Sequence, residues 1–332
     1  WLRFPPDMTE KQNNTQNLHQ KGTGNWLLDD DRFVEWQNYA GSLWIHGPSG
    51  AGKSVLCSII IGKLRDDQWR FKHEKRTAIA FFYFDFKEEK RQSVEIALRR
   101  IVLQLSAQSP HFYQTLNERY RASNGQFIAS YDNLLQVLEE LLKAFGHTYI
   151  VLDALDECRE NDHQRLVNLI STLQSWSGIS LHLLVISQPR SIFTEGFGDM
   201  THIALQLDNM KKDIEVFVIT QLRERPKLKH LAGYTRDIID TVLDKSNGMF
   251  RLAACLLDEI SRHPLPGKLK ETLTNLPSDL HAIYDRFFQR IPTDYLAYVE
   301  NALHYIIFSA RPVTLCELDD ALAVNISSSE QY

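Results

Sequence analysis

Eight consecutive residues near the start of the chain carry the strongest chemical signal in the sequence. They run from Gly47 to Ser54 and read Gly-Pro-Ser-Gly-Ala-Gly-Lys-Ser, a complete G-x-x-x-x-G-K-S pattern. Glycines let a backbone curl so that successive N–H groups point inward as a nest for an anion, backed by a helix N-terminus. Lys53 adds a point charge for β- and γ-phosphate oxygens, and the Ser54 hydroxyl is a ligand for Mg²⁺. The pattern predicts a nucleoside-triphosphate site.

The residues on either side of this loop fit the same prediction. The apolar run Leu43-Trp44-Ile45 precedes it as a strand, and Val55 to Leu64 follows with the period of a helix. A phosphate loop requires this strand–loop–helix order. From ordinary residue frequencies, the pattern would arise by chance in about one chain of this length in a hundred. We therefore expect phosphate contacts from Gly47, Pro48, Ser49, Gly50, Ala51, Gly52, Lys53 and Ser54.

A run of carboxylates follows a second apolar strand. The stretch Tyr149 to Leu152 ends in Asp153, and Asp156 and Glu157 come three and four residues later. A carboxylate at a strand end can hold Mg²⁺ directly or through water. A carboxylate slightly further on can orient or deprotonate the water that attacks a γ-phosphate. Alone, each acid would be read as a solvated loop charge or a helix N-cap. Together they predict Asp153 at the metal, and Glu157 with Asp156 at the water.

Strands and helices alternate through roughly the first two thirds of the chain. Runs that are apolar on both faces, separated by helical periods, are typical of a parallel sheet covered on both sides. The fold class expected is therefore α/β, a doubly wound P-loop domain. The predicted strands are 43–45, 78–84, 149–152, 181–186 and 203–207.

After about Asp208 the strand signal disappears. The remaining sequence predicts helices over 213–225, 235–246, 251–262, 279–290, 295–308 and 315–323, with Ser278 as an N-cap. The second half is therefore expected to be helical.

Composition and charge narrow the class of protein. The 332 residues carry a net charge of -5, which gives no overall basic field for nucleic acid. The four cysteines are scattered, which favours a reducing compartment over a disulfide scaffold or a zinc knuckle. The charge-free stretch from Leu166 to Pro189 is interrupted by polar residues and is not expected to span a membrane. We expect a soluble cytoplasmic protein, and a fragment of a longer one because the chain does not begin with Met.

At this point the sequence resembles a known family. The phosphate loop together with Asp153-Ala154-Leu155-Asp156-Glu157 resembles the NACHT branch of the STAND nucleotide-switch ATPases, closest to fungal NLR-like proteins of incompatibility and innate recognition. Four other parts of the chain carry the likeness: the segment before the loop, the second strand, the helical region and the start of a winged-helix domain. They are Gly22–Leu27, Ala80–Phe86, Asn247–Phe250 with Leu256–Glu259, and Leu276–Pro312.

The resemblance implies a layout and a mode of action. It divides the chain into a leader (1–21), a NACHT P-loop domain (22–207), a helical domain (208–277) and the start of a winged-helix domain (278–332), which we expect to be truncated. Thr23 and Gly24 would lie near the base. ADP would hold the domains closed, and exchange for ATP would open them for self-oligomerisation, with slow hydrolysis as a reset. Effector and sensor regions would lie outside this chain.

Two departures from the family pattern bear on these expectations. Gln188 stands where relatives carry an arginine that senses the γ-phosphate, which predicts weakened hydrolysis or sensing; Arg190 lies two residues on. Gly248-Met249-Phe250 stands where many relatives outside the fungal group have a proline that touches the base.

Alternative interpretations stay open. A fast AAA+-type motor, or a module that holds nucleotide with little or no hydrolysis, would use the same loop. The absence of Asn-Lys-x-Asp favours ATP over GTP without excluding GTP. His304 is read as a surface histidine rather than a phosphate clamp, and Phe81–Phe84 as core rather than a base-stacking platform. The basic residues Lys72, His73, Lys75 and Arg76 are read first as a solvated connector and second as a phosphate contact.

Overall fold

A single parallel sheet forms the centre of the first part of the molecule. The computed structural model describes residues 2, 5–70, 76–109, 111, 113–122, 124, 128–262, 266–309, 311 and 313–328. The five strands lie in the order β2-β3-β4-β1-β5, and each neighbouring pair is parallel. They are β1 (Gly41–His46), β2 (Thr77–Tyr83), β3 (His147–Asp153), β4 (Leu181–Ser187) and β5 (Thr201–Ala204). The doubly wound sheet predicted from the sequence is confirmed.

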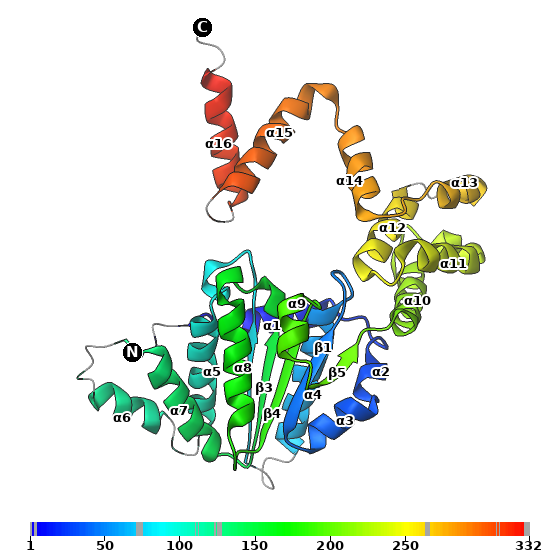
Figure 1. The fold of residues 1–332 in the computed structure, drawn as a ribbon. Helices are drawn as coiled ribbons and strands as arrows, with labels where there is room; N and C mark the ends of the chain where they lie inside the picture. Colours follow the sequence, from blue (N-terminus) through cyan, green and yellow to red (C-terminus); the bar gives the residue numbers. More distant parts are fainter. Residues whose placement is uncertain are drawn as a thin grey trace.

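Helices cover both faces of this sheet (Figure 1). The connection from β1 to β2 runs one way across the sheet, and the later connections run back. Because such crossovers are right-handed, the first helix lies on one face and the later helices on the other. All seven residues of β4 are buried, as expected for a strand covered on both sides. The covering helices are α3 (Asp31–Asn38) and α4 (Lys53–Arg70) on one face, and α5 (Val94–Gln108), α7 (Tyr131–Lys143), α8 (His163–Ser175) and α9 (Ser191–Gly196) on the other.

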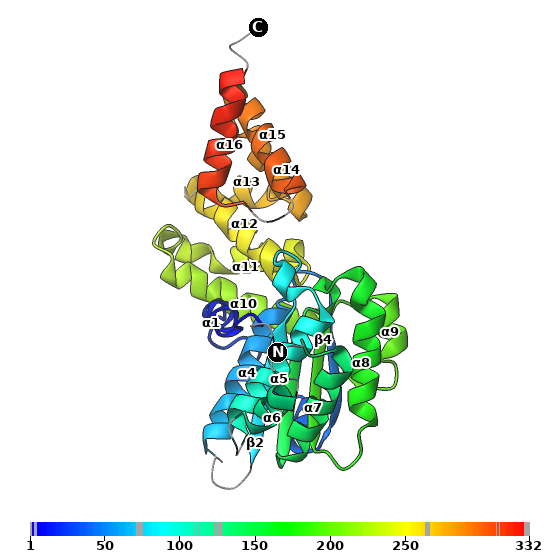
Figure 2. The same ribbon diagram turned by 90° about the vertical axis from the view of Figure 1, so that its left-hand side faces the viewer.

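The segment before the phosphate loop packs against the sheet domain. Met8 is fully buried in the core cluster of that domain, and α1 (Thr9–Asn17) packs along α4 (Figure 2). The smaller elements of this part of the chain are α2 (Asn25–Leu28), α6 (Gln114–Ala122), and the 3-10 helices Glu89–Arg91, Leu155–Glu157 and Glu160–Asp162.

A second, separate core lies in the helices that follow the sheet. Its buried residues run from Ile214 to Leu276, whereas Met210 still belongs to the core of the sheet domain. The helices are α10 (Leu207–Glu224), α11 (Thr235–Ser246), α12 (Phe250–Arg262) and α13 (Leu269–Thr274), with 3-10 helices at Lys229–Tyr234 and Pro266–Lys268.

The start of α10 corrects two sequence predictions. The last strand ends at Ala204 and not at Leu207, and the helix begins at Leu207 rather than at 213. The apolar period that marks the helix in sequence begins at Ile214, but the turn before it packs Met210 onto the sheet domain. The first turn of α10 packs on the sheet domain and the later turns pack in the second core. The apolar residues of the first turn therefore do not continue the helical spacing that begins at Ile214.

Three helices complete the described chain: α14 (Leu280–Gln289), α15 (Thr293–Phe308) and α16 (Leu315–Ser328). The N-cap of α14 is Asp279, which accepts a hydrogen bond from the Ala282 amide at 2.8 Å, and not Ser278 as predicted. Arg290, just after α14, forms ion pairs with the buried carboxylate of Glu259 on α12. No strand occurs here in the described residues, so the winged-helix assignment stays a prediction, and its Ala310 and Pro312 lie outside them. Within the same residues, no helix has the length and apolar content that crossing a membrane requires.

Candidate nucleotide-binding site

The phosphate loop lies at the carboxyl edge of the sheet, where the chain direction of the crossovers reverses. Ligands of open α/β sheets bind in the crevice at such a reversal. The loop begins against β4, since the Gly47 amide donates to the Ser187 carbonyl at 3.3 Å. Gly50 and Gly52 have φ of 76° and 82°, a region that favours glycine. These two residues give the loop the inward curl that an anion nest requires.

Lys53 lies over this loop. Its ammonium donates to the carbonyl oxygens of Gly47 at 2.9 Å and Pro48 at 2.8 Å. Burial lowers the pKa of Lys53, while the nearby charges of Asp156, Asp153 and Glu157 act in the opposite direction. The ammonium is therefore held at the mouth of the nest, within reach of an anion bound by the loop.

Asp153 is the most deeply buried acid of the site. It ends β3 with 1% of its surface exposed, and neither of its carboxylate oxygens has a hydrogen-bond partner of ordinary geometry. Burial raises the pKa of Asp153 to about 6, although the neighbouring Ser54 hydroxyl and Lys53 charge counteract this. A buried carboxylate without partners beside a hydroxyl fits a hard divalent cation. Ser54 and Asp153 are thus chemically suited to hold Mg²⁺, and their role at a metal stays a prediction.

The two acids that follow Asp153 have different surroundings. Ala154, with φ of 56°, turns the chain into the 3-10 helix Leu155–Glu157. Asp156 accepts the Gln188 amide at 2.8 Å on one oxygen and the Gln188 side-chain amide at 2.7 Å on the other. The two hydrogen bonds to Asp156 therefore link the end of β3 to the end of β4.

Glu157 is half-buried and less constrained. One of its oxygens accepts the Phe86 amide at 3.4 Å, and the other has no hydrogen bond with the described residues. Burial raises the pKa of Glu157, and the charges of Asp85 and Asp156 raise it further. Of the two residues predicted to prepare water, Glu157 has the free acceptor and Asp156 does not.

One charged pair at this edge was missed by the sequence analysis. Asp85, which is buried just beyond β2, forms an ion pair with Lys11 of α1 at 2.9 Å. Burial acts to raise the pKa of Asp85, but the hydrogen bonds from Lys11 and from the Lys87 amide lower it overall. The rule that identified Asp153, an acid directly after an apolar strand, also applies to Asp85. Its basic partner could not be found, because Lys11 lies 74 positions away in the sequence.

A cavity of about 350 Å³ adjoins the loop. Gly50 and Gly52 form one side, α4 and the segment around Thr23 form others, and α10 and α12 close it with mostly apolar side chains. Thr23 lines it, and its hydroxyl donates to the Gln20 carbonyl at 2.8 Å. Asp213 of α10, which the sequence did not single out, also lines it.

Gly24 lies behind this cavity rather than on its surface. Its amide donates to Asp213 at 3.0 Å, and its φ is 75°. A Cβ at this position would lie 2.7 Å from Leu56 Cδ2, so glycine permits the close approach to α4. Gly24 is therefore placed to shape the cavity.

The N-terminus of α12 covers the loop from the other side. Asn247 and Gly248 turn the chain with φ of 46° and 76°. Met249 then packs on Gly50, where a Cβ would lie 2.7 Å from Met249 Cγ, and Phe250 lines the cavity. The segment that departs from relatives with a proline thus presents an aromatic ring to the cavity.

His304 and the basic connector lie elsewhere. His304 is exposed on α15 beside the Phe308 ring, and none of the hydrogen bonds, ion pairs or ring contacts of the described residues joins it to the loop. Arg76 precedes β2, whereas Lys72, His73 and Lys75 lie outside the described residues.

A parallel sheet with a phosphate loop between β1 and α4, and a buried carboxylate at the end of β3, defines a P-loop NTPase fold. Residues 22–188, half of the chain, match the family described as "Nephrocystin 3, N-terminal". The chain belongs to this family, whose N-terminal region is related to NACHT domains.

Several solved structures share a general likeness of fold. Cdc6p from Pyrobaculum aerophilum is 14% identical over 99% of this chain and 83% of its own, with a TM-score of 0.39. The ORC1 protein of Aeropyrum pernix, solved in complex with DNA, is 13% identical over 93% and 78%, with a TM-score of 0.43. The RuvB Holliday junction branch migration motor of Thermotoga maritima is 13% identical over 96% and 82%, with a TM-score of 0.32. No curated protein matches the chain.

Proposed function

We propose that this chain is a nucleotide-dependent signalling switch of the STAND class, in the NACHT branch and closest to the fungal NLR-like group. It binds Mg²⁺ with ATP or ADP, hydrolyses ATP slowly, and uses the bound state to control opening and self-association. One observation carries the proposal: the cavity beside the phosphate loop is closed by α10 and α12, which belong to the second core. A bound nucleotide would therefore contact both parts of the chain at once.

The phosphate end of the site uses a few groups in separate roles. The loop amides and Lys53 hold the phosphates, and Ser54 with Asp153 would hold Mg²⁺, which neutralises developing charge on the phosphate oxygens. Glu157, with its free acceptor oxygen, orients the attacking water. Asp156 acts through the position of Gln188 and not on the water itself.

The base end of the site favours adenine over guanine. One Asp213 oxygen, Oδ2, accepts both the Gly24 amide at 3.0 Å and the Trp26 indole N–H at 2.9 Å. Its other oxygen has no hydrogen bond with the described residues and can accept from a ligand. In the pose that we propose, position 6 of the base faces this oxygen: the adenine amino group donates to it, whereas guanine and hypoxanthine present a carbonyl oxygen there, which a carboxylate repels. The cavity of about 350 Å³ is within the range of small-molecule sites.

Slow hydrolysis follows from the sensor position. The Gln188 side chain is neutral and hydrogen-bonded to Asp156, while Arg190 is exposed at the start of α9. A positive charge aimed at the γ-phosphate contributes strongly to turnover in P-loop enzymes. Position 188 adds no such charge to that of Lys53, which favours a switch over a fast motor. The same observation supports the second candidate, a module that holds nucleotide without hydrolysis.

The helices α10 and α12, which line the cavity, couple the bound nucleotide to domain motion. Met249 rests on Gly50, Phe250 faces the cavity, and Asp213 ties α10 to the segment before the loop. A ligand shifts a conformational equilibrium only through different contacts in the two states. Contacts to both cores provide that difference.

Direct titration with fluorescent ATP and ADP analogues tests the proposal. Lys53→Ala should weaken binding at least 50-fold, because it removes a charged phosphate contact and more than about 2 kcal/mol of binding energy. Arg70→Ala is the matched control, since Arg70 is an exposed cation in the last turn of the same helix. Equal binding by wild type and Lys53→Ala would contradict the proposal.

Turnover measured on the same protein separates the candidates. Turnover at about 10 per second, ordinary for an enzyme, would indicate the motor. Turnover several hundred-fold slower, with nucleotide exchange that a further ligand accelerates, supports the switch. Bound ATP that is never hydrolysed indicates the module.

A further inference from the structure

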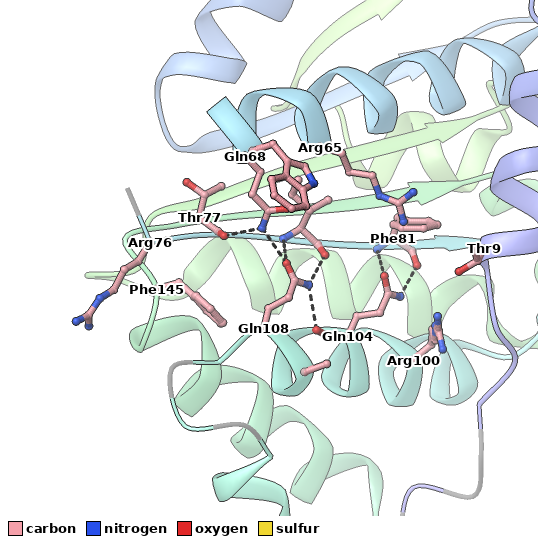
Figure 3. Close-up of a pocket in the computed structure, with 13 residues that line it drawn as sticks. Thr9, Arg65, Gln68, Arg76, Thr77, Phe81, Arg100, Gln104, Gln108 and Phe145 are labelled. Atoms are coloured by element: carbon pink, nitrogen blue, oxygen red, sulfur yellow. Dashed lines mark hydrogen bonds between the residues drawn. The ribbon is translucent and has the colours of Figure 1, made fainter. Parts of the chain in front are cut away.

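A larger cavity, of about 630 Å³, lies at the outer edge of the sheet between α4 and α5 (Figure 3). The edge strand β2 forms its floor, α4 one wall and α5 the other. It shares no lining residue with the cavity beside the phosphate loop.

Two glutamines of α5 close the polar edge of β2. Gln104 accepts the Phe81 amide at 3.2 Å and donates to the Phe81 carbonyl at 2.8 Å. Gln108 does the same for Ile79, at 3.1 and 2.8 Å. The unpaired backbone N–H and C=O groups of an edge strand can form hydrogen bonds with another strand. Because both residues are already paired, the cavity is not a docking edge for a peptide strand.

The glutamine amides also have little capacity left for a ligand. Gln108 donates its second hydrogen to the Gln104 carbonyl at 3.0 Å and accepts from the Gln68 side chain at 3.0 Å. Gln68 donates in turn to the Thr77 carbonyl at 2.8 Å. The polar floor is therefore satisfied internally, and the charged side chains of the cavity are left to attract a ligand.

Those charged side chains are arginines. Arg65 of α4 and Arg100 of α5 flank the end of the cavity near Thr9, and Arg76 lies at the opposite end (Figure 3). Arg65 is half-buried above the Phe81 ring, 4.9 Å from its centroid, and makes no ion pair with the described residues. A partly buried cation without a carboxylate partner is unfavourable unless an anion joins it.

Arg100 is only partly satisfied. Its Nη2 contacts Asp7 at 2.6 Å, but its Nε is buried and has no hydrogen-bond partner. The Asp7 side chain is 67% exposed and also accepts from the amide and the hydroxyl of Thr9. Asp7 thus forms an ion pair with Arg100 only, although its charge also acts on Arg65. One buried donor of Arg100 remains unused.

The rest of the lining is apolar and aromatic. Ile79 and Phe81 of β2, Ala107 of α5, Phe145 and Trp69 surround the space between the two charged ends. Arg65 and Arg100 with Asp7 give a net charge of about +1 at one end of the cavity, and Arg76 adds a further positive charge at the other. A phosphate monoester carries about -1.5 to -2 at pH 7. Guanidinium groups also match phosphate oxygens in a two-point geometry.

We propose that this cavity binds a small organic phosphate, with the phosphate group between Arg65 and Arg100 and a flat apolar body extending over Phe81 toward Phe145. The phosphate accepts hydrogen bonds from the guanidinium groups of Arg65 and Arg100, and it displaces part of the contact with Asp7. The aromatic side chains cover the body. The ligand is distinct from the nucleotide of the phosphate loop in place and in the groups that bind it.

Calorimetric titration with 1-naphthyl phosphate tests this site. The titrations use the chain with Lys53→Ala, so that the phosphate loop cannot account for the heat. One saturable site is expected, weakened at least tenfold by Arg65→Gln and by Arg100→Gln. Arg70→Gln, an exposed arginine of α4 outside the cavity, should bind like the parent chain. 1-Naphthol should bind at least tenfold more weakly, because it lacks the phosphate.

Two results would overturn the proposal. One is the absence of saturable binding at ligand concentrations up to about 5 mM. A dissociation constant of that size corresponds to a binding free energy of only roughly 3 kcal/mol. The other is equal affinity in the parent, Arg65→Gln and Arg70→Gln chains. Arg65 makes no ion pair in the described residues, so a melting curve of Arg65→Gln close to that of the parent is expected and separates loss of binding from loss of fold.

Discussion

Two cavities adjoin a single helix, α4, and we propose that they bind anions by different means. The helix has 18 residues and is about 27 Å long. At its N-terminus the backbone amides of the phosphate loop point at the ligand, and the helix dipole favours negative charge. Toward its C-terminus the dipole has the opposite sign, and the amides of Ile79 and Phe81 are taken by glutamines. A site there must rely on full side-chain charges, and it is lined by three arginines.

The acidic side chains near the two cavities also differ, in their burial and in their partners. At the phosphate loop, Asp153 is buried and without partners, which suits a divalent cation between it and a phosphate. At the second cavity, Asp7, which pairs with Arg100, is exposed and shared among several donors. We therefore propose a metal–phosphate complex at the first site and a phosphate without a metal at the second.

The largest expected effect comes from Asp153→Asn. The pKa of Asp153 is raised from 3.8 to about 6 by burial, so the folded chain binds this proton more tightly than the unfolded chain. That contribution to stability is full below about pH 4 and is lost as the pH rises through 6. Without metal and nucleotide, the substitution should raise the free energy of unfolding at pH 7.5 by about 3 kcal/mol.

Urea unfolding at pH 4, 5, 6 and 7.5 checks this expectation. The advantage of Asp153→Asn over wild type should grow with pH, and Asp132→Asn, at an exposed acid of α7, should show no such trend. The same variant should lose the Mg²⁺ dependence of nucleotide binding. An advantage that shrinks with rising pH would show that Asp153 is stabilised as a charge and not held for a cation.

Gly47→Ala should be next in size. A Cβ at Gly47 would lie 2.9 Å from Leu205 Cβ, an atom fixed to the backbone, and such overpacking costs about 1–3 kcal/mol. Gly41→Ala is the matched control, because a Cβ there would meet nothing within 4 Å. Thermal unfolding should give a lower melting temperature for Gly47→Ala than for Gly41→Ala. Gly47→Ala should weaken nucleotide binding and leave 1-naphthyl phosphate binding unchanged, and a loss of both would remove the distinction between the cavities.

Asp213→Asn should change the base preference by about tenfold, or about 1.4 kcal/mol. Wild type should bind ATP more tightly than ITP, which differs in having a carbonyl for the amino group at position 6. The asparagine amide can donate to that carbonyl, so the variant should narrow or reverse the preference. Competition against a fluorescent nucleotide measures the ratio. Equal binding of ATP and ITP by wild type would show that Asp213 does not read the base.

Gln104→Leu should have the smallest effect, about 1 kcal/mol of stability. It removes the two hydrogen bonds that close the edge of β2 at Phe81. Gln114→Leu, on the exposed surface of α6, should change stability by less than about 0.5 kcal/mol. Chemical unfolding compares them. If Gln104→Leu proved as neutral as the control, the edge strand would not depend on its glutamine pairing.

The sequence predicted the sheet and the phosphate end of the site because these depend on local patterns. The strand before Gly47, the turn glycines and the acid that ends β3 are each visible within a short run of consecutive residues. Lys11 beside Asp85, Asp213 beside Gly24 and Arg65 near Arg100 depend on which elements pack together, and no local pattern reports that. The engagement of Asp156 by Gln188 is of the same kind, since it requires adjacent ends of β3 and β4.

The most direct test of the account is the nucleotide that heat releases from freshly purified protein, identified and counted by chromatography, with Lys53→Ala in parallel. The account predicts nearly one ADP per chain from wild type and none from the variant, because Lys53 and the loop hold the phosphates while α10 and α12 retain the base. An equal nucleotide content in both proteins, or an empty wild-type chain that takes up no added nucleotide, would contradict it.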